Sequence, residues 1–257
     1  MKHRKGILVV SIGTSHMDTL ENAIGAIERM VAERFPEYRV YRAFTSRMII
    51  QKLKRAKGIE IQTVPEALER MSADGVETVL VQPTHIINGI ENDSMLEEVL
   101  EYARHFQRVR VGKPLLSSPD DYKKVVHAVM EEVGLTAGEA LVLMGHGTRH
   151  YANSAYPTLE YTFHLLGYQQ VLVGTMEGFP SLSDVMGKLA MSDCRKVRLM
   201  PFMVVAGGHA KRDMAGEEGS WKCELEEAGY EVDVLAKGLG ELEGIRRIFL
   251  EHLEEIR

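Results

Sequence analysis

The chain is poor in cysteine. Its 257 residues include only two, Cys194 and Cys223, and neither belongs to a CxxC motif. A disulfide framework or a zinc–thiolate site requires several cysteines at characteristic spacings. We therefore expect neither feature, and we interpret the two cysteines as buried free thiols.

Long apolar runs are also missing. No stretch reaches the ~18 consecutive apolar residues that suggest a membrane span. The basic start of the chain leads into an apolar run that ends at Gly13, and this run is too short for a signal peptide. We expect a cytoplasmic protein with no membrane partner.

Basic charge is nowhere concentrated. The chain has 31 Lys and Arg residues against 37 Asp and Glu residues, which gives a formal net charge of −6. Nucleic-acid-binding proteins usually carry a basic block or stripe, so we expect no nucleic-acid partner. A hydrophobic content of 45% is ordinary for a globular protein, and the length suits one large domain or two lobes.

Common nucleotide-binding and hydrolase motifs are not found. The glycine-rich loop at 145–148 lacks the third glycine of a Rossmann fingerprint and the Gly-Lys-Ser/Thr ending of a P-loop. No Gly-x-Ser-x-Gly sequence occurs, which disfavours a generic α/β hydrolase. The loop therefore matches neither of these nucleotide-binding motifs.

What the chain does have is a regular alternation of apolar, β-rich runs with helical patterns. This order predicts an α/β fold with mainly parallel sheets, flanked by helices and joined by right-handed crossovers. The predicted strands lie at 7–10, 39–44, 78–82, 108–111, 140–144, 171–175, 197–200 and 231–234. The predicted helices lie near 17–33, 46–57, 65–73, 94–105, 155–166, 181–191, 215–228 and 242–256.

The two halves of the chain resemble each other. Residues 8–14 parallel residues 142–148, and residues 81–89 parallel residues 199–207. We infer two similar lobes, at 1–135 and 136–257, with a cleft between them. A cleft between lobes is a favoured place for a ligand.

Three residues with metal-binding side chains recur at nearly equal intervals. His146 and Glu177 are 31 positions apart, Glu177 and His209 are 32 apart, and each follows a predicted strand. A strand, a helix and the return to a parallel strand take about 30 residues. The spacing therefore predicts three side chains at the carboxyl ends of parallel strands, where such sheets bind ligands. Two imidazoles and one carboxylate could hold a divalent transition metal with coordination positions left open.

Four of the candidate residues also have an ordinary structural explanation. His146 could cap a turn, and Glu177 could cap a helix or lie at the surface as a solvated acid. His85 could be a hydrogen-bonded core histidine or a substrate contact. Glu91 could be a first-turn helix acid or a proton acceptor that faces the metal.

Short motifs along the chain resemble those of one known family, the CbiK-type anaerobic sirohydrochlorin cobaltochelatases. They are VSIGTS at 10–15, RAFTS at 42–46, HIING at 85–89, PLLSS at 114–118, MGHGT at 144–148, LMP at 199–201 and GSWK at 219–222. The resemblance covers nearly the whole chain and keeps the motifs in order. It implies two flavodoxin-like lobes around a cleft, as in the wider class of chelatases that includes ferrochelatase.

The resemblance also implies an activity and site residues. The activity is ATP-independent insertion of Co²⁺ into sirohydrochlorin, giving cobalt-sirohydrochlorin in anaerobic cobalamin (vitamin B12) biosynthesis. By motif position, the family's metal-binding residues fall on His146, Glu177 and His209, and a cleft glutamate linked to proton removal falls on Glu91. Arg149 departs from the family pattern, where a smaller or neutral residue is usual.

Metallation of a tetrapyrrole replaces two pyrrole N–H protons with a divalent cation. We expect His146 and His209 to bind the metal and accept protons, Glu177 to be the third ligand, and Glu91 to relay protons. Sirohydrochlorin carries many carboxylates, so substrate-binding donors are needed. The candidates for substrate binding are Ser11, Thr14, His85, Gly147, Thr148 and Arg149.

The sequence leaves several alternatives open. Imidazoles also bind Fe²⁺, Ni²⁺ and Zn²⁺, so a sirohydrochlorin ferrochelatase of siroheme synthesis remains an alternative. A carrier that binds metal or tetrapyrrole without turnover is another. The sequence does not distinguish a monomer from a homo-oligomer.

Overall fold

The computed structural model describes residues 4–257. Within this range the chain forms two compact units: unit 1, made of residues 4–117 with Ile245–Arg257, and unit 2, made of Ser118–Gly244. Each unit contains a four-stranded sheet, in the orders β2-β1-β3-β4 and β6-β5-β7-β8. All neighbouring strands are parallel. The predicted α/β class is therefore confirmed, and the two units share one strand order.

Unit 1 is built around the central strand β1 (Lys5–Ser11), in which Ile7, Leu8, Val9 and Val10 are fully buried. A strand that is buried on both faces requires helices on both sides of the sheet. Its other strands are β2 (Arg39–Phe44), β3 (Thr78–Pro83) and β4 (Arg108–Val111). Its helices are α1 (Met17–Thr19), which continues through a π-helical turn (Leu20–Ile24) into α2 (Gly25–Arg34), α3 (Arg47–Lys57), α4 (Val64–Ala73), α5 (Ile90–Tyr102) and α10 (Glu243–Ile256).

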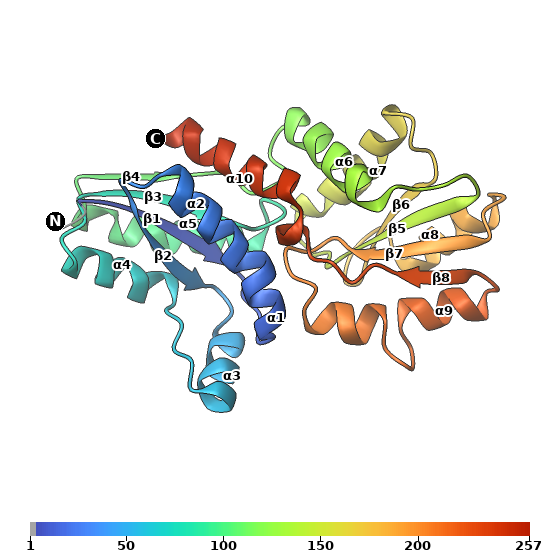
Figure 1. The fold of residues 1–257 in the computed structure, drawn as a ribbon, viewed down its shortest axis with the longest axis horizontal. Helices are drawn as coiled ribbons and strands as arrows, with labels where there is room; N and C mark the ends of the chain where they lie inside the picture. Colours follow the sequence, from blue (N-terminus) through green and yellow to red (C-terminus); the bar gives the residue numbers. More distant parts are fainter. Residues whose placement is uncertain (1–3) are drawn as a thin grey trace. The chain divides into compact units, whose positions relative to one another are not determined.

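Unit 2 repeats this plan around β5 (Glu139–Gly145), which is buried along its whole length. Figure 1 shows α6 and α7 on one side of its sheet and α9 on the other. The other strands are β6 (Val171–Thr175), β7 (Lys196–Pro201) and β8 (Glu231–Val234). The helices are α6 (Pro119–Val133), α7 (Ala155–Leu165), α8 (Leu182–Ala190), a π-helical segment, η4 (Ala210–Met214), and α9 (Trp221–Glu227).

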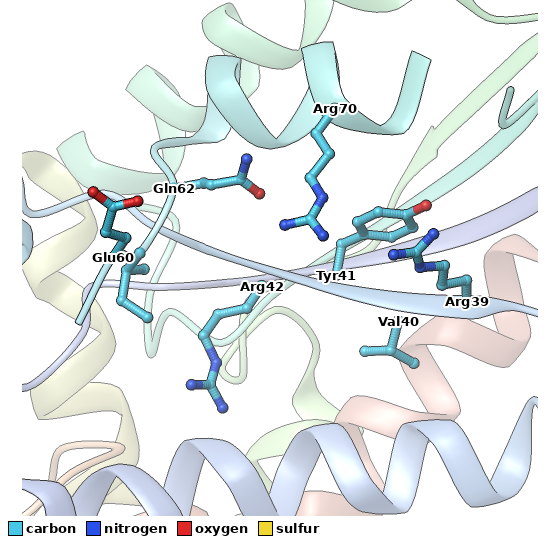
Figure 2. Close-up of a pocket in the computed structure, with 8 residues that line it drawn as sticks. Arg39, Val40, Tyr41, Arg42, Glu60, Gln62 and Arg70 are labelled. Carbon is cyan, nitrogen blue, oxygen red and sulfur yellow. The ribbon is translucent and has the colours of Figure 1, made fainter. Parts of the chain in front are cut away.

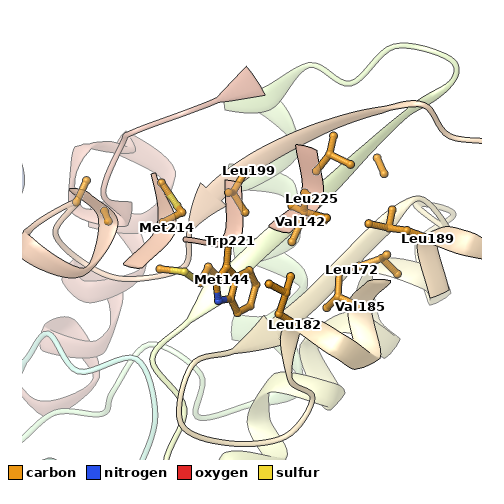
Figure 3. Packing of buried hydrophobic residues seen from close by; sticks show 14 residues of the cluster. Val142, Met144, Leu172, Leu182, Val185, Leu189, Leu199, Met214, Trp221 and Leu225 are labelled. Atoms are coloured by element: carbon orange, nitrogen blue, oxygen red, sulfur yellow. The ribbon is translucent and has the colours of Figure 1, made fainter. Parts of the chain in front are cut away.

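One hydrophobic cluster of unit 2 anchors the strand ends that lead to the candidate site. The Trp221 ring packs among residues that include Met144 and Met214 (Figure 3). Met144 lies two residues before His146, and Met214 lies five residues after His209. The core therefore fixes the backbone on the two segments from which these histidines project.

The predicted strands are confirmed to within two residues at each end, but three helices differ from the prediction. Helix α5 begins at Ile90, four residues before the predicted range 94–105, and ends at Tyr102. The helix expected at 215–228 begins only at Trp221, because the Ser220 hydroxyl accepts from the Cys223 amide and caps it there. Helix α6 was not predicted, although Ser118 caps it and Pro119 occupies its first turn.

The two units also divide the chain differently from the predicted lobes 1–135 and 136–257. Helix α6 belongs to unit 2, and the last 13 residues, Ile245–Arg257, belong to unit 1. The reason is packing, since Ile245, Ile248, Phe249 and Leu253 of α10 are buried and the His252 ring nitrogen Nδ1 lies 3.0 Å from the Lys113 carbonyl of unit 1. None of the described helices is long and apolar enough to span a membrane.

Candidate metal centre

The turn that carries His146 depends on the two glycines beside it. A Cβ atom on Gly147, which has φ +79°, would lie 2.7 Å from the backbone nitrogen of Gly178. A Cβ atom on Gly145 would lie 2.3 Å from the Tyr156 ring. Only glycine fits at either position, and the close approach brings His146 next to the loop that follows β6.

Backbone hydrogen bonds join the loop of His146 to the loop of Glu177. The Glu177 amide donates to the His146 carbonyl at 2.9 Å, and the Met176 amide donates to the Gly145 carbonyl at 3.1 Å. The Glu177 carboxylate oxygen Oε2 lies 4.0 Å from His146 Nδ1. The predicted proximity of these two residues follows directly from the pairing of β5 with β6.

His209 joins them from the far side of β5. It lies eight residues beyond the end of β7, which pairs with β5, and immediately precedes the π-helical segment η4. Its ring and that of His146 meet edge to face, with centroids 5.0 Å apart and planes at 89°. The structure therefore brings His146, Glu177 and His209 together at the carboxyl ends of three adjacent parallel strands.

The hydrogen bonds of the two rings determine which nitrogen is free. His146 Nδ1 lies 3.1 Å from the Gly147 carbonyl, and His209 Nδ1 lies 2.6 Å from Asp213 Oδ2. The hydrogen bond from Arg212 holds the pKa of the Asp213 carboxyl below its usual range, despite partial burial, and the bond from His209 lowers this pKa further. A carbonyl and a carboxylate can only accept, so each Nδ1 carries the proton. Each Nε2 is left with a lone pair that can bind a metal.

The arrangement is open rather than closed. The side chains of His146 and His209 are each 44% exposed, and that of Glu177 is 65% exposed. Among residues 4–257, no three His, Cys, Asp or Glu side chains already form a metal cluster. The Glu177 carboxylate faces Nδ1 of His146 rather than Nε2, so its side chain must turn before it can share an ion with both rings. Two fixed imidazoles and one rotatable carboxylate suit a cation that is first bound and then released.

Three residues that support this site were not predicted from the sequence. Asn153 accepts from the Thr148 amide at 3.0 Å and donates to the Phe179 carbonyl at 2.6 Å. Burial raises the pKa of Tyr156 to about 12, and its hydroxyl accepts from the Gly147 amide at 3.4 Å. Asp213 is the third, and its signal was the four-residue interval from His209, which places both side chains on one helical face.

These contacts change the expectation for the glycine-rich loop. Gly147 and Thr148 were candidates for binding a substrate carboxylate, but their backbone amides are both hydrogen-bonded within unit 2. The Thr148 hydroxyl accepts from the His150 amide and keeps its own proton available. Thr148 through its hydroxyl, together with the exposed Arg149, is therefore the better candidate in this loop.

The remaining candidates lie in unit 1. Ser11 and Thr14 are buried, and their hydroxyls bond to Thr84 and Thr19 at 2.9 Å and 3.1 Å. Glu91 is exposed in the first turn of α5, whose N-cap is Gly89. This position agrees with the first-turn interpretation, and a role of Glu91 in proton relay stays a prediction.

His85 is the most unusual of the unit 1 candidates. It is 4% exposed, and neither ring nitrogen has a hydrogen-bond partner in the described part of the chain. Burial lowers its pKa, while Asn92 and Glu91 act in the opposite direction. The ring is therefore neutral near pH 7. His85 lies in the core, as one of the two interpretations expected, and its contact with substrate stays a prediction.

A separate hollow of about 200 Å³ in unit 1 contains none of the candidate residues. Figure 2 shows Arg70 reaching from α4 toward the space between Gln62 and Tyr41. The other two arginines that line the hollow form ion pairs, Arg39 with Asp74 and Arg42 with Glu28. The hollow is thus an ion-paired edge of the sheet beside β2, and we assign it no part in the metal chemistry.

Comparison with known proteins identifies the same family as the sequence motifs. The sequence profile of a family described as cobalt chelatase (CbiK) matches residues 5–257. The sirohydrochlorin cobaltochelatase of Salmonella typhimurium is 40% identical over 98% of this chain and 96% of its own length. The sirohydrochlorin cobaltochelatase CbiKC of Nitratidesulfovibrio vulgaris is 34% identical over 97% of this chain and 89% of its own length.

Solved structures support the fold. SirB from Bacillus subtilis with Fe³⁺ matches with a TM-score of 0.68 over 98% of this chain and 94% of that one, at 16% identity. CbiX, described as the terminal enzyme for biosynthesis of siroheme in denitrifying bacteria, matches with a TM-score of 0.58 over 98% of this chain and 99% of that one, at 18% identity. The full-length match to the family profile and the two long, closely related sequences together show that this chain belongs to the CbiK cobalt chelatase family.

Proposed function

We propose that this chain inserts Co²⁺ into sirohydrochlorin, without a nucleotide, and thereby produces cobalt-sirohydrochlorin for anaerobic cobalamin biosynthesis. Family membership and the activity named for both relatives support the reaction. The observation on which the mechanism depends is the pair of imidazoles 5.0 Å apart, each with Nδ1 hydrogen-bonded and Nε2 free.

The cobalt ion is a substrate, and the site must bind it reversibly. His146 and His209 offer Nε2 donors, and Glu177 turns to supply a carboxylate oxygen as the third ligand. Three protein ligands leave coordination positions for water and then for pyrrole nitrogens. Because the three side chains are exposed, the ion can be transferred to the macrocycle without unfolding the site.

Proton removal completes the exchange. Each pyrrole N–H must lose a proton as the metal enters, and two protons leave for each ion inserted. A bound cation disfavours the imidazolium form of its ligand, so His146 and His209 become proton acceptors only as the ion moves away from them. Glu91 is our candidate for relaying these protons, and Ser11, Thr14, His85, Thr148 and Arg149 are our candidates for holding the substrate.

The test is anaerobic metallation of sirohydrochlorin, followed by absorbance. His146→Ala and His209→Ala should each lower the rate by at least about 100-fold, because each removes a metal donor and a proton acceptor. His127→Ala, which removes an exposed histidine on α6, is the matched control and should retain the wild-type rate. Wild-type rates for both site variants would refute the mechanism.

The metal and the turnover are separate parts of the proposal. Imidazole ligands also suit Fe²⁺, Ni²⁺ and Zn²⁺, so we expect these ions to bind and to compete with Co²⁺. Competition assays with Co²⁺ and Fe²⁺ at equal concentration distinguish a cobaltochelatase from a ferrochelatase. Tight binding of metal or tetrapyrrole with no metallated product would identify a carrier instead.

A further inference from the structure

The two imidazoles of the candidate metal centre are held by chemically different acceptors. His146 Nδ1 faces a neutral backbone carbonyl, that of Gly147, at 3.1 Å. His209 Nδ1 faces an anionic side chain, Asp213, at 2.6 Å. A charge-assisted hydrogen bond is shorter and about twice as strong as a neutral one. The two rings are therefore not equivalent as donors.

Asp213 is itself held in a fixed orientation. Arg212 donates from Nε to Oδ1 at 3.1 Å and from Nη2 to Oδ2 at 3.3 Å, so that both carboxylate oxygens are occupied. A side-by-side arginine–carboxylate contact of this kind fixes the plane of the carboxylate. Since Oδ1 faces Arg212 and Oδ2 is shared with His209, Asp213 is better placed to orient His209 than to bind a metal itself.

The local helix explains why these residues lie together. Ala210 and Met214 are buried in the unit 2 core at an interval of four residues. His209 and Asp213 have the same interval and lie one position earlier, so they share an adjacent and more exposed face. The side chain of Asp213 is 35% exposed, against 44% for His209. The core thus holds the segment, and the segment presents the hydrogen-bonded pair.

We propose that Asp213 is a positioning residue that fixes the ring orientation of His209, keeps the proton on Nδ1, and strengthens Nε2 as a donor to the divalent ion. The inference rests on the proposed function, because it takes His209 to be a metal ligand. Hydrogen-bond partners of this kind on ligating histidines typically change metal affinity by about 10–100-fold when they are removed. Arg212 supports the arrangement through its hydrogen bonds to Asp213.

The test compares Co²⁺ binding by full-length variants. Asp213→Asn keeps the shape and an acceptor oxygen but removes the charge, and it should weaken Co²⁺ binding by roughly 10-fold. Asp213→Ala removes the acceptor as well and should weaken binding by roughly 100-fold. Asp193→Asn removes an exposed acid elsewhere in unit 2 and is the charge-matched control.

Three further measurements separate positioning from a general structural role. The absorption bands of bound Co²⁺ should shift in Asp213→Asn, because they report the ligand field. The KM for Co²⁺ should rise while the KM for sirohydrochlorin stays unchanged, whereas a distorted site would change both. The urea unfolding midpoint of the metal-free variant should match that of the wild type.

The outcomes distinguish this inference from the proposed function. If His209→Ala loses Co²⁺ while Asp213→Asn keeps the wild-type affinity and spectrum, the positioning role is refuted and the metal centre stands. If His146→Ala and His209→Ala both bind Co²⁺ like the wild type, the metal centre itself is refuted. A Glu substitution, Asp213→Glu, should bind Co²⁺ better than Asp213→Ala, since it restores the charge.

Discussion

Glycine 147 shows how closely a single residue constrains the metal centre. Its φ of +79° is strained for any residue with a Cβ atom, and that atom would also lie 2.7 Å from the Gly178 backbone nitrogen. The Gly147→Ala substitution should therefore cost roughly 1–3 kcal/mol for the backbone conformation and about 1–3 kcal/mol more for the overlap. It should also abolish tight Co²⁺ binding, because the loops of His146 and Glu177 must separate.

Gly167 provides a matched control for this prediction. Its φ is +94°, but a Cβ atom there would meet nothing within 4 Å. Gly167→Ala should therefore show only the backbone cost in urea unfolding and should bind Co²⁺ normally. Equal losses of stability in the two variants would mean that the close approach of Gly147 to Gly178 is unimportant.

His85 gives the protein a pH dependence at the residue scale. Burial lowers the pKa of its ring below the usual 6.5. As the pH falls below about 6.5, the unfolded chain therefore binds a proton that the folded chain does not, and the free energy of unfolding decreases. Above this range neither state binds the proton and the contribution is constant. Urea midpoints measured between pH 7.5 and 5.5 should fall less in His85→Gln than in the wild type.

The exposed His127 serves as the control for that measurement. His127→Gln leaves the buried His85 in place and should therefore keep the full decrease of the wild type. A wild-type decrease in His85→Gln would show that His85 takes up its proton without cost to the fold, and would argue against its burial.

At the scale of elements, the edge strand β6 depends on one buried acid of α7. Glu160 is 7% exposed, accepts from the Val173 amide at 2.8 Å and pairs with Lys188. Glu160→Ala leaves that amide without its acceptor and should cost about 2–3 kcal/mol in urea unfolding. Glu160→Gln keeps an acceptor and should cost only about 1 kcal/mol. Equal costs would assign the effect to the loss of the Lys188 pair alone.

The strands and the spacing of the candidate ligands could be predicted from the sequence. Runs such as Leu-Val-Leu in β5 are apolar at every position because both sheet faces are covered, and so the strands were predictable. The spacing of His146, Glu177 and His209 followed from the length of a strand–helix unit. These are local or periodic signals, which a single sequence carries.

Other features depend on contacts that no local pattern records. Nothing in the α10 sequence specifies that Phe249 packs in unit 1, so the predicted boundary at 135–136 did not include this return of the chain. The amides of Gly147 and Thr148 donate hydrogen bonds to Tyr156 and Asn153, which lie in the helices that follow this loop. The four-residue interval between His209 and Asp213 could have predicted their contact, but only once it was known that a helical segment begins at His209.

At the scale of the whole molecule, the chain first forms most of unit 1, then all of unit 2, and returns to unit 1 at Ile245. All three proposed metal ligands belong to unit 2, whereas Glu91, His85, Ser11 and Thr14 belong to unit 1. Metal binding and metallation should therefore depend on different parts of the fold. A substitution that weakens only unit 1 should leave Co²⁺ binding intact and should lower the rate of metallation.

Phe249 and Phe163 allow this division to be tested with the same chemical change. Both rings are fully buried, Phe249 on α10 in unit 1 and Phe163 on α7 in unit 2. Truncation to alanine should cost about 3–5 kcal/mol in either case. Phe249→Ala should reduce the hydrogen-exchange protection of β1 and β3, and Phe163→Ala should reduce that of β5 and β6.

Co²⁺ titration then connects folding to function. Phe249→Ala should bind Co²⁺ with nearly wild-type affinity and metallate sirohydrochlorin poorly, while Phe163→Ala should lose both properties together. If either variant lowers protection equally in all eight strands, the two units unfold as one, and Co²⁺ affinity should then fall in both variants. Because the ligands all lie in unit 2, intact Co²⁺ binding by Phe249→Ala would show that the metal centre forms independently of the unit that carries Glu91.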